Sequence, residues 1–369
     1  VNALVIGGNL TLNGKSANLA QYDTGSHTWY SRFEPQLYLY GAAAGEVYDL
    51  VVQPDPTNAP FDDLYVVGAF DTICKTCQQQ YCSVGLWTGD SFDKVGDGLC
   101  PRAVDVTMKI MAAALTASGD VFVGGTFQSR VWSGEKFVNI YNVAIQAAKD
   151  AWLPLQEPTG GGLGCNWCIV SVMSLAWNER DKRLYIGGKF NMVDSFYIEP
   201  GLAVWDAAGG IRGFPGGGLA YDTPPEDESG TVYDGVATSL IYDDETRSLY
   251  VAGTFERVGG MRCDSIAVWR EDSAAWTCLY EPHHSFSLIT SLEYTKQMLY
   301  VAGLPSNVSS WPGNRVAGGN GGADGGDGGD SNRSAPATGY TIARMSQSPA
   351  LFSGKYDYWG DGGNGGGGG

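Results

Sequence analysis

The chain repeats one short apolar pattern six times. Each copy has three apolar residues rich in β-branched and aromatic types, followed in most copies by a pair of small residues. The copies lie at 4–10, 64–70, 121–127, 184–190, 249–255 and 299–304. A continuous apolar run of this length predicts a strand that is buried on both faces, and the small pair predicts a close approach of backbones. We therefore expect these six segments to be the core strands of six similar units.

The spacing of the copies predicts one repeated supersecondary unit. Measured at the second residue of each copy, successive spacings are 60, 57, 63, 65 and 50 residues, a range typical of repeat architectures. After the core strand, two shorter apolar segments and then one further segment recur. In the fifth unit these are Ile266–Trp269, Trp276–Leu279 and Leu288–Leu292. Each unit thus predicts up to four short antiparallel strands.

Four-stranded antiparallel units repeated around a circle form a β-propeller. A parallel β-helix has much shorter repeats, and a tandem of sandwiches would need fewer, larger ones. We therefore predict an all-β fold, with a single β-propeller over residues 1–360 and six blades of four antiparallel strands.

A count of strands leaves a gap in this ring. Six blades of four require about 24 strands, but the first unit begins at its core strand and the last one ends before an equivalent of Leu288–Leu292. One strand is therefore missing from the sequence. The simpler explanation is that this sequence is a segment of a longer secreted or surface protein. The alternative is strand addition from a neighbouring molecule.

The repeat resembles a known family. Leu249–Phe255 with Ile266–Trp269 and Trp276–Leu279, and Leu184–Phe190 with Leu202–Asp206 and Gly216–Gly218, are similar to the kelch-like repeats in the propeller ectodomain of fungal cortical cell-polarity marker proteins and related eukaryotic surface proteins. The resemblance covers most of residues 1–360 at the level of the repeat. It implies a propeller and leaves the function open. The third unit departs from the pattern at Ile145, and the sixth at Arg344 and Met345, where the second, fourth and fifth units have tryptophan.

The charge balance excludes some classes of partner. The chain has 23 basic and 40 acidic residues, a formal charge of −17, which disfavours binding to nucleic acid or to an anionic membrane surface. The sequence contains no apolar run of about 18 residues, the length that a spanning helix needs. We expect no nucleic acid and no direct membrane insertion by this segment.

Cysteines and glycosylation sequons indicate an oxidising compartment. Eight cysteines occur together with sequons at Asn9, Asn307 and Asn332, so a secreted, extracellular or cell-surface location with N-linked glycans is expected. Two CxxC pairs also match zinc or redox spacing, but this context favours disulfides. We expect a disulfide between Cys263 and Cys278, which bracket two antiparallel strands. The other expected disulfide cysteines are Cys82 with Cys100, and the pairs Cys74 and Cys77 and Cys165 and Cys168, which either close locally or exchange partners.

Aromatic residues divide into two groups. Trp87, Trp205, Trp269 and Trp276 recur at fixed positions of the repeat, and we interpret them as core. Trp167 and Trp311 lie in loops outside these positions and are candidates for a binding surface.

Acidic loops offer weak candidates for a calcium ion, the one cofactor that the composition suggests. These are Asp222, Glu226, Asp227, Asp324, Asp327 and Asp330. Their spacing matches no established calcium loop, so solvated surface is the default interpretation. Residues 318–330 are then a Gly/Asp-rich flexible insertion, and residues 361–369 a Gly-rich tail or linker.

Catalytic motifs are missing from the sequence. It has no GxSxG, no HExxH and no phosphate-binding glycine loop, so we assign no catalytic residue. We expect a non-catalytic extracellular propeller module for protein interaction or structural assembly, in a matrix, a cell wall or a surface appendage. One alternative is a carbohydrate-binding or carbohydrate-hydrolysing propeller, since paired carboxylates depend on the fold. The other is the ectodomain of a cell-polarity or adhesion receptor.

Overall fold

The structure is a computed structural model. It describes residues 3–12, 15–30, 37–39, 43–53, 63–71, 82–88, 91–96, 99, 108–132, 137–147, 151–155, 162–166, 168–222, 234–279, 286–295, 298–305 and 341–346. Every regular element within these ranges is a β-strand, so the fold is all-β as expected.

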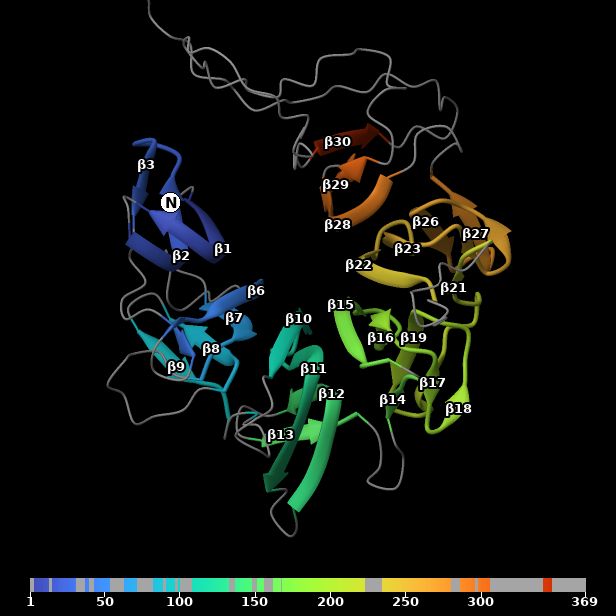
Figure 1. Ribbon diagram of the computed structural model, residues 1–369, viewed down its shortest axis with the longest axis horizontal. Coiled ribbons are helices and arrows are strands. Elements are labelled where there is room, and N and C mark those ends of the chain that lie inside the picture. Colours follow the sequence, from blue (N-terminus) through green and yellow to red (C-terminus); the bar gives the residue numbers. More distant parts are fainter. Residues whose placement is uncertain are drawn as a thin grey trace, which may run out of the picture.

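Sheets that carry the repeated strands are arranged around a ring (Figure 1). Each sheet is named after the first strand in its hydrogen-bonded order. The β6 sheet consists of β6 (Glu46–Gln53), β7 (Asp63–Ala69), β8 (Val84–Trp87) and β9 (Phe92–Lys94). The β10 sheet consists of β10 (Lys109–Leu115), β11 (Val121–Trp132), β12 (Phe137–Ala147) and β13 (Ala151–Pro154). The β15 sheet consists of β15 (Ser171–Asn178), β16 (Arg183–Lys189), β19 (Leu202–Asp206) and β20 (Gly210–Gly213).

The β22 sheet completes the group of four-stranded sheets, and two three-stranded sheets flank the group. The β22 sheet consists of β22 (Val236–Asp243), β23 (Ser248–Thr254), β26 (Ile266–Arg270) and β27 (Ala275–Cys278). The β1 sheet has β1 (Ala3–Leu12), β2 (Lys15–Asp23) and β3 (Thr28–Tyr30). The β28 sheet has β28 (Phe286–Thr295), β29 (Met298–Pro305) and β30 (Thr341–Ser346).

The strand order gives each full sheet the expected antiparallel pattern. The predicted core strands are β1, β7, β11, β16, β23 and β29, and each of the last five is second in its sheet. The first strands β6, β10, β15, β22 and β28 lie nearest the centre of the ring (Figure 1). In the β1 sheet the core strand itself comes first. Among the described residues, the strand that would pair with its inner edge is therefore missing.

A β-bulge recurs where the innermost strand pairs with the core strand. The register shifts at Val47/Asp49, Ile110/Ala112, Val172/Ser174, Ala237/Ser239 and Ile289/Ser291. The bulge brings the innermost backbone against the second small residue of the repeat. A Cβ at Gly68, Gly125, Gly188 or Gly253 would lie 1.9 to 2.1 Å from a carbonyl oxygen of that strand. Only glycine fits there, which explains the small pair in the sequence.

Hydrophobic cores lie between neighbouring sheets. One core, for example, joins Tyr65 and Val67 of the β6 sheet with Val121 and Val123 of the β10 sheet. Comparable cores join the β1 and β6 sheets, the β10 and β15 sheets, the β15 and β22 sheets, and the β22 and β28 sheets. The core strands β7, β11, β16, β23 and β29 contact apolar neighbours on both faces, so their described leucines and valines are almost fully buried.

Several short strands were not expected from the sequence. One small sheet consists of β14 (Leu163–Gly164), β17 (Met192–Val193) and β18 (Phe196–Tyr197). The next repeat has a matching small sheet, which consists of β21 (Leu219–Ala220), β24 (Arg257–Val258) and β25 (Met261–Arg262). The pair β4 (Tyr38–Leu39) and β5 (Ala43–Ala44) follows the β1 sheet. The β11 and β12 hairpin continues beyond the repeat, with Gln128 paired to Tyr141 and Trp132 to Phe137. Two-residue strands leave no hydrophobic periodicity, so pattern analysis missed them.

Within the described ranges, none of the elements is an apolar helix of the length needed to cross a bilayer.

Candidate functional site

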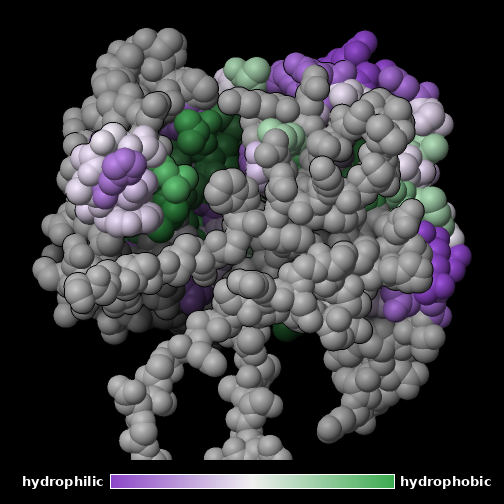
Figure 2. Space-filling view, turned by 90° about the horizontal axis from the view of Figure 1, so that it is seen from above, coloured by the Kyte–Doolittle hydropathy of each residue, from purple (hydrophilic) through white to green (hydrophobic). Residues whose placement is uncertain are grey.

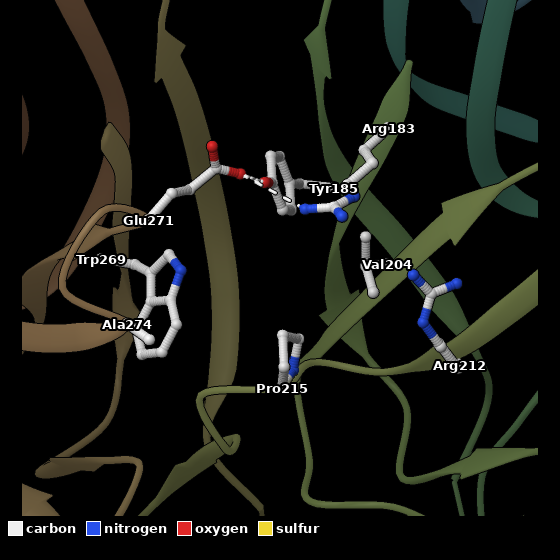
Figure 3. A pocket seen from close by; sticks show the side chains of 8 residues that line it. All are labelled: Arg183, Tyr185, Val204, Arg212, Pro215, Trp269, Glu271 and Ala274. Atoms are coloured by element: carbon white, nitrogen blue, oxygen red, sulfur yellow. Dashed lines mark hydrogen bonds and ion pairs between the residues drawn. The ribbon is translucent and has the colours of Figure 1, made fainter. Parts of the chain in front are cut away.

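A pocket of about 320 Å³ lies between the β15 and β22 sheets (Figure 3). It is lined by Arg183, Tyr185, Val204, Arg212, Pro215, Trp269, Glu271 and Ala274. The residues come from β16, β19, β20 and the loop after β20 in the β15 sheet, and from β26 and the β26–β27 turn in the β22 sheet. The packing of the two sheets thus places charged and aromatic side chains together, although they are far apart in the sequence.

Glu271 is the one carboxylate among the described residues that line this pocket, and its side chain is only 6% exposed. Its carboxylate accepts hydrogen bonds from the Tyr185 hydroxyl, from the Tyr242 hydroxyl at 2.8 Å and from Asn178 Nδ2 at 3.3 Å. The Arg247 guanidinium lies 3.4 Å from Oε2. Burial, together with the hydrogen bond to Glu271, raises the pKa of both tyrosines well above the usual value. The phenols therefore stay protonated and act as donors.

This arrangement is suited to holding the two sheets together. Both oxygens of Glu271 accept hydrogen bonds from several donors, and the described residues that line the pocket include no second carboxylate. Trp269 is 8% exposed, so its ring packs in the core and offers no open stacking platform. Glycoside hydrolysis commonly uses two carboxylates on either side of the bond, and this pocket supplies one.

The inner edge of the β1 sheet is the second candidate site. Leu4 in β1 is 54% exposed, whereas the equivalent residues of the other repeats, Leu64, Val121, Leu184, Leu249 and Leu299, are 0 to 6% exposed. Figure 2 views this side of the ring and shows hydrophobic residues in a hollow on the left, where the β1 sheet lies in Figure 1. An unpaired edge beside exposed apolar residues is a template for another strand.

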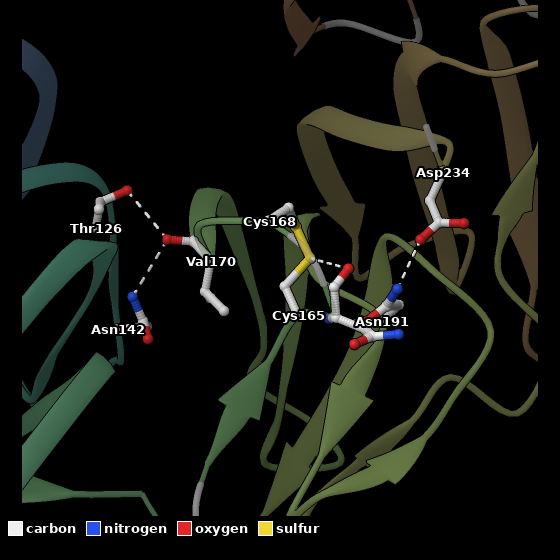
Figure 4. Close-up of a disulfide and its surroundings, with 8 residues drawn as sticks. Thr126, Asn142, Cys165, Cys168, Val170, Asn191 and Asp234 are labelled. Atoms are coloured by element: carbon white, nitrogen blue, oxygen red, sulfur yellow. Dashed lines mark hydrogen bonds between the residues drawn. A yellow bond between two sulfur atoms is a disulfide. The ribbon is translucent and has the colours of Figure 1, made fainter. Parts of the chain in front are cut away.

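Two disulfides fix loops at the strand ends that lie opposite the β26–β27 turn of the pocket. Cys165 and Cys168 form a disulfide with a Cα–Cα distance of 5.3 Å in the segment between β14 and β15 (Figure 4). The same segment is tied to the preceding sheet, because the Val170 carbonyl accepts hydrogen bonds from Thr126 Oγ1 at 3.2 Å and from Asn142 Nδ2 at 3.4 Å. Beside it, Asn191 Nδ2 donates to Asp234 at 2.8 Å. The surface around the disulfide is thus held by both neighbouring sheets.

The expected disulfide between Cys263 and Cys278 is also present, with a Cα–Cα distance of 5.4 Å. It joins the segment before β26 to β27, which pairs with β26. Cys82 is disulfide-bonded as well. Its expected partner Cys100, and Cys74 and Cys77, lie outside the described residues.

The repeated tryptophans lie where the repeat places core residues. Trp87 and Trp269 are 8% exposed, and Trp205 and Trp276 are half-buried. The Trp205 indole donates to the Leu155 carbonyl at 2.7 Å, and Trp276 donates to the Gly216 carbonyl at 2.7 Å. Both bonds reach the preceding sheet. The loop residues Trp167 and Trp311 lie outside the described residues.

Of the acidic calcium candidates, the described part of the chain includes Asp222. Its carboxylate lies 2.7 Å from Arg257 and 3.7 Å from Arg262, and the hydrogen bond from Arg257 is the main cause of its lowered pKa. No group of three or more potential metal ligands occurs among the described residues. The other candidates, Glu226, Asp227, Asp324, Asp327 and Asp330, lie outside that part, as do the sequons at Asn307 and Asn332. Asn9 lies in β1.

No family model matches the chain, and no curated protein matches it either. Among solved structures, the WD40 repeats of RRP9 match 73% of this chain and 61% of theirs, at 12% identity and a TM-score of 0.38. The extracellular domain of a hybrid two-component system from B. thetaiotaomicron matches 78% of this chain and 37% of its own, at 9% identity and a TM-score of 0.33. A Thermus thermophilus protein named as a glucose dehydrogenase-type oxidoreductase matches 82% and 93%, at 15% identity and a TM-score of 0.38.

The chain spans 61% and 37% of the first two matched chains. All three TM-scores lie below 0.5. The propeller-like fold therefore rests on the repeated sheets described above, and the three likenesses carry no argument about activity.

Proposed function

We propose that the chain is a non-catalytic extracellular propeller module for protein interaction or structural assembly. The observation that carries this proposal is the inner edge of β1, where Leu4 is 54% exposed although its equivalents are buried. Strand addition to such an edge supplies both main-chain hydrogen bonds and apolar burial. The module would thus bind a neighbour through the same contacts that hold its own sheets.

Features of the chain support an oxidising, extracellular setting. The disulfides Cys165–Cys168 and Cys263–Cys278 fix loops at the ends of two neighbouring sheets, and disulfides persist outside the reducing cytosol. The formal charge of −17 keeps such modules apart unless a specific contact forms. A matrix, a cell wall or a surface appendage offers this setting. No described feature adds support for the receptor ectodomain.

A carbohydrate-active propeller has less support. The described pocket presents Arg183 and Arg212 near Trp269, which are residue types that can contact sugars. However, Trp269 is buried, and the carboxylate of Glu271 is engaged by two tyrosines and an arginine. The geometry therefore favours an anchor between sheets over a hydrolytic site.

Electron microscopy of the native material tests the proposal. We expect repeating assemblies, or particles with additional density along the inner edge of β1. Leu4→Lys should lower assembly in sedimentation velocity experiments, because a buried lysine would be desolvated at the contact. Phe137→Lys is the matched control, since Phe137 is 55% exposed on a different sheet. Separate rings with no added density, unaffected by Leu4→Lys, would overturn the proposal.

A further inference from the structure

Adjacent sheets are joined by one recurring hydrogen bond between innermost strands. Asp49 Oδ2 accepts from the Ala113 amide at 2.9 Å, Ser174 Oγ from the Leu240 amide at 2.8 Å, and Ser239 Oγ from the Leu292 amide at 3.0 Å. Each acceptor directly follows the β-bulge of its strand, and each donor is one residue further along the next strand. The equivalent residue in β10 is Ala112, which has no side-chain acceptor. The bulge thus positions a side chain to bind the neighbouring sheet.

The innermost strand of the β28 sheet carries the same acceptor on the side that faces the gap next to β1. Ser291 follows the bulge of β28 just as Ser239 follows that of β22. Ser239 is 9% exposed, whereas Ser291 is exposed. The preceding threonines differ in the same way: Thr238 Oγ1 donates to the Ile289 carbonyl of the next sheet, whereas Thr290 is exposed. This end of the ring is therefore equipped for one more innermost strand.

The other end of the gap shows the complementary feature. Leu50 in β6 is the equivalent of the donors Ala113, Leu240 and Leu292. Its amide donates at 2.8 Å to Oδ1 of Asp49, the adjacent residue of its own strand. In the β10, β22 and β28 sheets the equivalent amide donates to a side chain of the preceding sheet. A strand beside β1 would bring such an acceptor to Leu50.

Apolar contacts define the two remaining positions of the expected strand. The residue two places before the acceptor packs on the first small residue of the preceding core strand, so a Cβ at Gly124 would lie 2.4 Å from Val172 Cγ1. In β29 the corresponding small residue is Ala302, which is half-buried although its equivalent Ala252 is 0% exposed. The residue after the acceptor is leucine in four of the five innermost strands, for example Leu240.

These four positions form a sequence pattern of Val, Ile or Ala, then any residue, then Ser or Asp, then Leu. The pattern occurs four times in the 369 residues, at 47–50, 172–175, 237–240 and 289–292. All four copies lie in the innermost strands β6, β15, β22 and β28, which are already paired. These 369 residues therefore hold no further copy of the pattern for the edge of β1.

We infer that the inner edge of β1 binds an extended segment of a neighbouring molecule that carries this four-residue pattern, antiparallel to β1. This inference rests on the proposed function and specifies its partner. The leucine amide of the segment donates to Ser291 Oγ, and its Ser or Asp side chain accepts from the Leu50 amide. Its first apolar residue packs on Ala302. Main-chain pairing with β1 gives affinity, and the pattern gives register and specificity.

Fluorescence anisotropy with a labelled synthetic peptide tests this inference. The probe copies Ser171–Asn178, the sequence of β15, and the matched peptide differs by valine in place of the serine at the acceptor position. We expect the probe to bind the full chain and the valine peptide to bind about tenfold more weakly, as expected for one lost hydrogen bond. Ser291→Ala should weaken probe binding by about the same factor. Ser273→Ala, at an exposed serine of the β26–β27 turn, is the control and should leave it unchanged.

The outcomes separate this inference from the proposed function. Equal binding of both peptides would overturn the pattern and leave an unspecific strand-binding edge. If neither peptide binds while Leu4→Lys still disrupts native assemblies, the inference fails and the module assembles by another contact. If neither peptide binds and the β1 amides are protected from hydrogen exchange in the isolated chain, a segment of the chain itself fills the gap, and the inference again fails. If native material is also unassembled, both proposals fail.

Discussion

At the scale of single residues, Asp49 differs from the serines that take its place in other innermost strands. Its two carboxylate oxygens accept from the Ala113 and Leu50 amides. Burial raises its pKa to about 6, although these hydrogen bonds act in the opposite direction. A buried carboxylate with a raised pKa stabilises the fold most when protonated, so its contribution is lost as the pH rises through 6.

Asp49→Asn should therefore flatten the dependence of stability on pH. Between pH 5 and pH 7.5 we expect the wild type to lose about 1 kcal/mol of unfolding free energy relative to the variant. Denaturant unfolding across this range, compared between the two proteins, measures the difference. Asp206→Asn is the control, because the half-buried Asp206 carboxylate has a lowered pKa from its hydrogen bond with Arg212. An unchanged slope in Asp49→Asn would contradict the assignment.

The sequence analysis did not predict this hydrogen bond between innermost strands, although its signal is present in the sequence. The repeated copies of Val, Ile or Ala, any residue, Ser or Asp, and Leu were present in the sequence and could have revealed the inter-sheet hydrogen bond. Glu271 could not have been identified in this way. Its partners Asn178, Tyr185, Tyr242 and Arg247 come from separate turns and strands, and their meeting depends on how two sheets pack.

At the scale of elements, the turns of neighbouring hairpins are tied together by Glu271. This residue lies in the β26–β27 turn, and its donors come from β15, β16, β22 and the β22–β23 turn. Glu271→Ala would leave the hydroxyls of Tyr185 and Tyr242 without their carboxylate acceptor. We expect a loss of about 2 to 4 kcal/mol in unfolding free energy, measured by denaturant titration.

Asp272→Ala provides the matched control for this substitution. Asp272 is the next residue and also pairs with Arg247, but its side chain is 69% exposed. An exposed ion pair contributes about 1 kcal/mol or less, so this variant should remain close to wild type. Equal destabilisation by the two substitutions would show that loss of an Arg247 ion pair explains both effects, and the anchor role of buried Glu271 would be wrong.

Strand positions were predicted well where a long apolar run repeats along the chain, and poorly where the strands are only two residues long. The core strands were found because an apolar run followed by small residues is typical of a strand with neighbouring strands on both sides. Gly188 shows why the small residues are needed, because its backbone lies close to the Ser171 carbonyl of the neighbouring strand. The small sheets β14–β17–β18 and β21–β24–β25 were missed, because their order depends on backbone contacts between loops. The count of strands in the sequence predicted the free edge of β1. The exposure of Leu4 and of the acceptor Ser291 could be seen only in the structure.

At the scale of the whole molecule, the sheets depend on their neighbours. Each core joins two adjacent sheets, so stability follows from nearest-neighbour contacts, as in other repeat architectures. The β15 sheet packs between the β10 and β22 sheets. The β1 sheet packs against the β6 sheet on one side, while Leu4 at its inner edge is exposed to solvent.

Hydrogen exchange should therefore be fastest at the open side of the ring. Peptides that cover β1 and β2 should exchange more rapidly than peptides that cover β16 and β19, because sheets with fewer packed neighbours open with a lower free energy. Mass spectrometry of the isolated chain measures both. Addition of the Ser171–Asn178 peptide should slow exchange in β1 and leave β16 and β19 unchanged. Equal protection of the two regions in the isolated chain would mean that the ring is already closed, and the exposed edge of β1 would not be a binding surface.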